Sequence, residues 1–175
     1  MTLQLDNKNL YAIPEFVSHL DIHTLILSCN NITEIKNLPP NLINLDLSGN
    51  CIRKIENLPN KLEKLNLSEN NITKIENIPN SVKVIDLYNN KIKDIENLSN
   101  NITKLDISSN NINKIKNLPN NLTELKIYEN KIERLPLSLV KLSHINSLNY
   151  HGNPIKYKSK KIDVWLDKIN KVNYN

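Results

Sequence analysis

A repeat of twenty residues occupies most of this chain and constrains its fold more than any other feature. When Ile22 is taken as position 1, six positions of each of the first five copies are aliphatic without exception. In the first copy these positions, 1, 4, 6, 11, 14 and 17, are Ile22, Leu25, Leu27, Ile32, Ile35 and Leu38. A repeat of this length predicts a solenoid, in which each unit buries its apolar side chains against its neighbours and none can do so alone.

The spacing within a copy predicts how its backbone runs. Positions 4 and 6, for example Leu45 and Leu47, have the period of two that is typical of a short strand. About 14 residues then return the chain, so the next strand lies parallel at a spacing of about 4.8 Å. Pro59 and Pro79 fix φ and end any helix, which favours an extended return. We therefore predict seven or eight short parallel strands on one face and mostly non-helical segments on the other.

The pattern L-x-x-L-x-L-x-x-N-x-I-x-x-I resembles the leucine-rich repeat, closely over residues 22–135 and more loosely at both ends. The resemblance implies an α/β solenoid, a leucine-rich-repeat horseshoe with a parallel concave sheet. It also implies that the Asn at position 9 of each copy bonds neighbouring turns in a buried ladder. We further expect Asn, with 33 residues in the chain against two Gly, to form the turns that need a left-handed backbone.

Two subfamilies share particular features with these repeats. Segments such as "KIENLPN" resemble the leucine-rich regulatory subunit of protein phosphatase 1, although that subunit has two more residues per repeat. The twenty-residue length with "LPPNL" is closer to secreted leucine-rich effectors of pathogenic bacteria, whose C-terminal ligase domain this sequence lacks. Neither resemblance identifies a partner for this chain.

The two ends depart from the period, and we divide the chain into an irregular repeat at 1–21, regular repeats at 22–154 and a capping helix at 155–175. Leu3, Leu5, Leu10 and Ile13 align with the first regular copy at an offset of 22 residues. Leu148 and Asn153 continue the pattern after a copy of about 23 residues. Because no N-terminal cap is evident, the first strand is expected to leave an open edge, which tolerates exposure, self-associates or docks a partner.

The C-terminal segment "SKKIDVWLDKINKV" predicts an amphipathic helix with Ser159 as its N-cap. We expect its apolar face to pack on the last coil, which would make the helix a cap. The alternative is a basic helix that binds a membrane or an acidic partner. The apolar face comprises Ile162, Trp165, Leu166, Ile169 and Val172.

Charge is unevenly distributed along the chain. Residues 1–150 contain 17 basic and 16 acidic residues, a net of +1, whereas residues 151–175 contain six Lys and two Asp, a net of +4. The basic character therefore belongs to the tail and does not indicate nucleic-acid binding. No apolar run is long enough to span a bilayer, and the N-terminus has no signal-peptide pattern. With only Cys29 and Cys51, we expect an intracellular, cytoplasmic protein.

Catalytic and cofactor motifs are absent from the sequence. It contains no phosphate-binding glycine loop, no H-E-x-x-H and no C-x-x-C, and its four His are scattered. We therefore expect a chain that is not an enzyme and that uses no cofactor and no metal.

Departures from the repeat consensus mark the candidate site. Positions 3, 5 and 7 alternate with the core residues and face the concave side, where Asp and Ser are ordinary consensus residues. The charges at positions 13 and 15 are expected to form a solvated convex face. Asp86 and Asp106 should lie side by side, with Lys104 relieving their repulsion. Our candidate partner-binding residues are Val84, Asp86, Tyr88, Asp106, Lys126 and Tyr128.

This patch predicts a non-catalytic module that binds a protein partner through its concave face, because aromatic residues in a polar concavity are typical interface anchors. Two alternatives stay open: a regulatory or targeting subunit of an enzyme such as a phosphatase, and a structural repeat protein that self-associates through its N-terminal edge. Neither nucleic acid nor a membrane is an expected partner.

Overall fold

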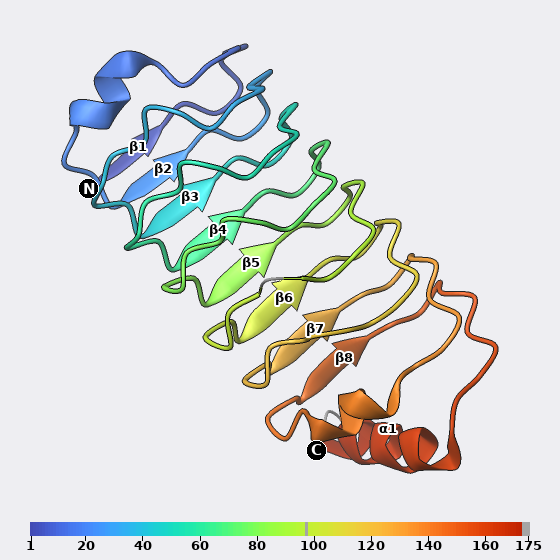
Figure 1. Cartoon of the computed structure of the whole chain (residues 1–175). Coiled ribbons are helices and arrows are strands. Elements are labelled where there is room, and N and C mark those ends of the chain that lie inside the picture. Colours follow the sequence, from blue (N-terminus) through green and yellow to red (C-terminus); the bar gives the residue numbers. More distant parts are fainter. Residues whose placement is uncertain (97, 173–175) are drawn as a thin grey trace.

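Eight short parallel strands follow one another in a single sheet whose spatial order is the order of the sequence (Figure 1). The computed structural model describes residues 1–96 and 98–172. Each strand is followed by a long return segment on the other side of the sheet (Figure 1). The strands are β1 Thr2–Gln4, β2 Thr24–Ile26, β3 Asn44–Asp46, β4 Lys64–Asn66, β5 Val84–Asp86, β6 Lys104–Asp106, β7 Glu124–Lys126 and β8 Ser147–Asn149.

The pairing of the strands reproduces the period of the sequence. Between β2 and β7, each central residue pairs with the residue twenty positions later, for example Leu45 with Leu65. At the N-terminal end the offset is 22, since Leu3 pairs with Leu25. At the C-terminal end it is 23, since Leu125 pairs with Leu148. The predicted repeat lengths are therefore confirmed, and they bring equivalent positions of successive copies side by side.

The core lies directly behind the sheet. From β2 to β7, the central residue of each strand is buried and its two neighbours are more exposed. Positions 1, 6, 11 and 14 are buried with it, as Leu62, Leu67, Ile72 and Ile75 illustrate. The residues at position 17, such as Leu58, are packed against this core but only partly buried. A fully buried side chain of this size contributes roughly 2 kcal/mol, and each copy supplies several.

A ladder of buried Asn side chains holds the turn that follows each strand. Asn50 Oδ1 accepts the N–H of Ile32 at 2.9 Å, and its Nδ2 donates to the carbonyls of Leu27 and Leu47, both at 3.0 Å. Each such Asn thus satisfies backbone groups in its own copy and in the copy before it, as the resemblance implied. The ladder comprises Asn30, Asn50, Asn70, Asn90, Asn110 and Asn130, all 6–7% exposed, and Asn153 extends it to the last copy.

The left-handed turns are only partly made by Asn. At position 16, Asn37, Asn57 and Asn77 have φ near 54°, and each donates a side-chain hydrogen bond to a carbonyl of the preceding copy. Asn97, which occupies position 16 of a later copy, lies outside the described residues. At position 8, however, the left-handed residues include Glu69 and Glu129, with φ of 55° and 52°. At position 8 the expectation that Asn makes these turns therefore holds for Asn89, but residues of other types adopt the same left-handed conformation in other copies.

Helices occur mainly at the two ends (Figure 1). Short 3₁₀ helices span Glu15–His19 (η1) and Leu137–Lys141 (η2), and the α-helix α1 spans Lys160–Val172. Helix α1 packs on η2 and β8 and buries Ile162, Leu166 and Ile169. Trp165 is half-buried against the core. The helix therefore caps the solenoid as predicted, while the side chain of Val172 lies outside the described residues.

Asn90→Ala should lower the free energy of unfolding by about 2 kcal/mol or more, because it leaves the Ile72 N–H and the Leu67 and Leu87 carbonyls without their buried partner. Chemical denaturation of both proteins measures the difference. Asn71→Ala, a change next to but outside the ladder, is the control and should cost much less. Equal losses in the two variants would contradict a special role for the ladder.

Candidate functional site

The candidate site lies on the outward face of β5, β6 and β7, the central and C-terminal strands of the sheet (Figure 1). Strand register places Asp86 beside Asp106 and Asp106 beside Lys126. Tyr88 and Tyr128 follow β5 and β7 at the equivalent position. All six residues predicted from the sequence are therefore brought to one face, and each is half-buried or packed against its neighbours: Val84, Asp86, Tyr88, Asp106, Lys126 and Tyr128.

Three aromatic rings form a row on this face. The rings of Tyr88 and Tyr128 are 6.1 Å apart and inclined at 39°. Their strands are two ladder steps apart, about 9.6 Å, so the rings lean toward each other. The imidazole of His151, after β8, stacks on Tyr128 at 5.0 Å with an angle of 6° between the planes. We call Tyr88, Tyr128 and His151 the aromatic row.

Ser108 is a buried residue between the first two rings in the order of the copies. It occupies the equivalent position in the copy between Tyr88 and Tyr128, and it is 0% exposed. Its hydroxyl finds no hydrogen-bond partner within the part of the chain that the structure describes. Ser68, one copy earlier, instead donates to Asn66 Oδ1 at 2.8 Å. Ser108 is thus a small, buried residue between the positions of the two tyrosines.

Charged groups border the aromatic row. Lys126 Nζ lies 3.5 Å from a carboxylate oxygen of Asp106 and 3.6 Å from one of Glu124. Lys104, expected to relieve the repulsion between Asp86 and Asp106, pairs with Glu124 at 3.3 Å. The expectation for Lys104 is therefore corrected: its side chain extends across the sheet to β7, and Lys126 reaches Asp106.

The pKa values reflect this crowding. Burial raises the pKa of Asp86, and the charge of Asp106 adds to the effect, although the Tyr88 N–H opposes it. Burial lowers the pKa of Lys126, but the carboxylates of Asp106 and Glu124 outweigh it and raise the pKa. Burial and the charge of Asp106 also raise the pKa of Tyr128. The face thus presents a protonated phenol and a firmly cationic lysine beside a carboxylate that is costly to ionise.

Val84 adds one apolar side chain to this surface. In the register it lies between Lys64 and Lys104, where the neighbouring copies have polar or charged residues. The structure also contributes residues that the sequence interpretation did not select, namely Ser108, Glu124 and His151. The sequence places Glu124 at position 3 and Ser108 and His151 at position 7, but it does not show the direction of each side chain.

Comparisons with known proteins agree with this architecture. Two family models, both described as leucine-rich repeat, match residues 61–82 and 98–114. A search of curated protein sequences finds no significant match. The chain therefore contains leucine-rich repeats and folds as a leucine-rich-repeat solenoid, as its twenty-residue pattern predicted.

Solved structures of bacterial effectors are among the similar folds. YopM from Yersinia enterocolitica WA-314 is 26% identical with a TM-score of 0.69, over 88% of this chain and 38% of that one. The leucine-rich-repeat domain of a Shigella effector is 23% identical with a TM-score of 0.80, over 97% of this chain and 76% of that one. The matched region thus spans well under half of the Yersinia enterocolitica YopM chain. The predicted resemblance to bacterial effectors is confirmed at the level of the fold.

Residues 1–96 and 98–172 contain no group of three His, Cys, Asp or Glu side chains that could hold a metal ion. No described helix has the length and apolar character needed to cross a membrane. Cys29 and Cys51 are free thiols.

Asp86→Asn should raise the melting temperature at neutral pH. The pKa of Asp86 is raised in the folded protein, so the ionised carboxylate costs stability above that pKa. This cost disappears as the pH falls below the ordinary value of 3.8, and the gain of the variant should disappear with it. An Asn keeps the acceptor for the Tyr88 N–H, as Asn66 does for Ser68.

Thermal unfolding of both proteins between pH 3 and 7 measures this effect. Asp46→Asn is the matched control, because Asp46 pairs in register with the neutral Asn66 and not with a second carboxylate on that side. A destabilised Asp86→Asn protein at pH 7 would contradict the assignment of an electrostatic cost to Asp86.

Proposed function

We propose that this chain is a non-catalytic interaction module that binds a protein partner through the concave face of its sheet. The aromatic row is the observation that carries the proposal. Tyrosine is enriched at binding hot spots because it combines a large apolar ring with a polar hydroxyl. Here Tyr128 contacts both Tyr88 and His151, and such mutual packing of the rings reduces the side-chain freedom that is lost when a partner binds.

The charge arrangement supports the same conclusion. Asp86 remains a carboxylate where the neighbouring strand has Asn66, which makes the same turn bond without a charge. Residues that serve a function often lower the stability of the folded protein. A partner that supplies a positive counterion for Asp86 would explain why this carboxylate is kept. Lys126, Asp106 and Glu124 would then align a partner with complementary charges around the aromatic row.

A pull-down from a lysate of the source organism tests this proposal. Tyr88→Ala/Tyr128→Ala should reduce capture of the specific partner at least tenfold, as expected for loss of two anchor residues. Tyr11→Ala, which removes an exposed aromatic side chain from the N-terminal coil, is the control and should bind normally. Circular dichroism checks that both variants fold. Undiminished capture by the Tyr88/Tyr128 variant would reject the concave site.

The captured protein also tests the alternative role as a regulatory subunit. Adding the purified chain to a captured enzyme, such as a phosphatase, should change the enzyme's rate or substrate choice if the chain regulates it. An unchanged rate with intact binding would favour a simple adaptor.

Self-association through the N-terminal edge is the second candidate, and a specific observation favours it. Strand β1 has a partner on one side only, and Leu3, Leu5 and Leu10 are only partly buried. Met1 and Phe16 on the same coil are 84% and 55% exposed. An open strand edge beside exposed apolar side chains is a surface that a second copy can cover.

Light scattering over a range of concentrations should then show the mass rising from 20.2 kDa toward twice that value. Phe16→Glu should suppress the rise. Leu137→Glu, which alters an equally exposed residue on the 3₁₀ helix near the other end, should leave it unchanged. A constant mass at every concentration would eliminate this candidate.

A further inference from the structure

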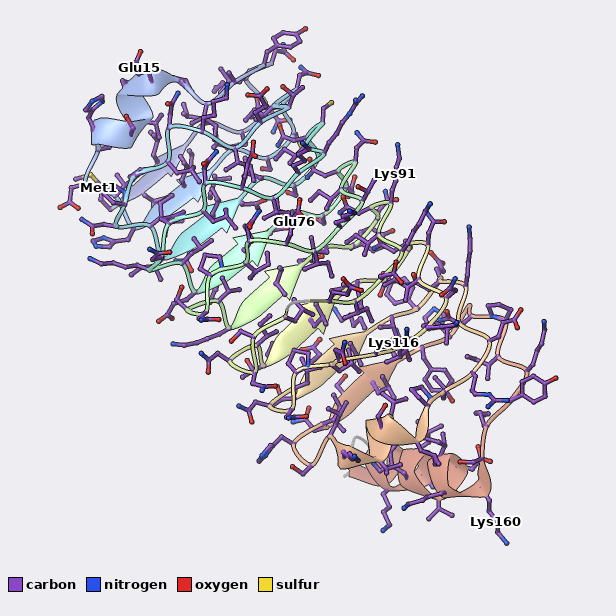
Figure 2. The ribbon with its side chains drawn as sticks, in the orientation of Figure 1. Met1, Glu15, Glu76, Lys91, Lys116 and Lys160 are labelled. Atoms are coloured by element: carbon purple, nitrogen blue, oxygen red, sulfur yellow. The ribbon has the colours of Figure 1, made fainter. Side chains whose placement is uncertain are left out.

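The return segments of the last copies form an open groove on the side of the solenoid opposite the sheet face. Its volume is about 710 Å³. We call it the basic groove; its lining includes Lys114, Ile115, Lys116, Lys131, Glu133, Arg134, Pro136 and Tyr157. In Figure 2, Lys116 lies in the C-terminal half of the solenoid, between Glu76 and the start of α1 at Lys160. The convex side is therefore more than the evenly solvated surface expected from the sequence.

Positive charge dominates this groove. Four cations line it, and Glu133 is the acidic residue among the lining side chains. Glu133 is already neutralised by Lys156, whose Nζ lies 2.8 Å from its carboxylate. A neighbouring hollow shares Arg134, Pro136 and Tyr157 and adds Lys158 to the same surface. Cationic side chains of the return segments and Lys158 of the C-terminal tail therefore lie on the same surface.

The chain builds the groove by laying residues 155–157 beside the preceding copy. The N–H of Lys156 donates to the Glu133 carbonyl at 2.9 Å, and Arg134 and Tyr157 form a parallel bridge. This contact places the guanidinium of Arg134 5.3 Å from the centre of the Tyr157 ring. A guanidinium held on an aromatic face keeps its N–H edge available for a carboxylate.

Apolar groups complete the surface. Ile115 forms part of the floor, and the Tyr157 ring is 58% exposed. Leu137, in the neighbouring hollow, is 55% exposed. A ligand that matches this surface carries several negative charges and at least one apolar or aromatic side chain.

We propose that the basic groove binds an acidic linear segment of a protein partner in an extended conformation. Carboxylates would pair with Lys114, Lys116, Lys131 and Arg134, and an apolar side chain would rest on Tyr157. A hollow nearer the N-terminus is lined by Glu76, Asp94 and Glu96 with one Lys. A long polyanion such as a nucleic acid would be repelled there, whereas a short acidic segment ends before reaching it. This site is separate from the concave face and does not depend on the function proposed for it.

Fluorescence anisotropy on the full chain tests the proposal. The probe is a labelled ten-residue peptide of Glu and Asp with one central Phe. We expect saturable binding that weakens as salt rises from 50 to 300 mM. Lys114→Glu/Lys116→Glu should weaken binding at least tenfold. Lys91→Glu/Lys93→Glu, which makes the same charge change at exposed residues in an earlier copy, should weaken it by less than twofold.

Three results would overturn the proposal. The first is no saturable binding of the peptide, and the second is an equal loss in both lysine variants, which would mean diffuse attraction to a basic protein. The third is tighter binding of a twenty-nucleotide single-stranded DNA than of the peptide, together with loss of that DNA binding in Lys114→Glu/Lys116→Glu. This result would make the groove a nucleic-acid site. Tyr88→Ala/Tyr128→Ala should keep full peptide binding, so a failure of the concave site leaves this test unaffected.

Discussion

The bonds of the buried Asn ladder are the interaction on which the rest of the structure depends. Each strand ends in a tight turn that buries backbone N–H and C=O groups, and these groups are costly unless they are paired. The side-chain amide of Asn accepts through its oxygen and donates through its NH₂ group, which is what the turn needs. Asn50 accepts from the Ile32 N–H and donates to the carbonyls of Leu27 and Leu47. Because each Asn bonds its own copy and the preceding one, the ladder also keeps the copies in register.

The Asn ladder and the aliphatic core stabilise every copy, so the residues at the outward strand positions can differ between copies. The outward-facing aromatic residues are not evenly distributed, since Tyr88, Tyr128 and His151 lie close together over one region of the sheet. Asp86 keeps a charge that burial and Asp106 disfavour, although Asn66 shows that the turn does not require it. A costly charge beside ordered aromatic rings is the strongest indication of a binding surface on this face.

The two sides of the solenoid offer different chemistry. The concave side presents aromatic rings with mixed charges in ion-pair contact, which suits a structured protein surface. The opposite side presents an open groove with excess positive charge and an exposed tyrosine, which suits an extended acidic segment. A solenoid of stacked copies can carry both surfaces because neither takes residues from the core.

The sequence by itself determined the repeat, the register and the outward-facing residues. A period of two within strands and of twenty between them leaves one way to bury every aliphatic residue, so Leu45 had to pair with Leu65. Only the tertiary structure decided which long side chains meet: Lys126 reaches Asp106, Lys104 reaches Glu124, and the tail brings Tyr157 under Arg134. These contacts depend on rotamers and on the path of irregular segments, and a repeating pattern specifies neither.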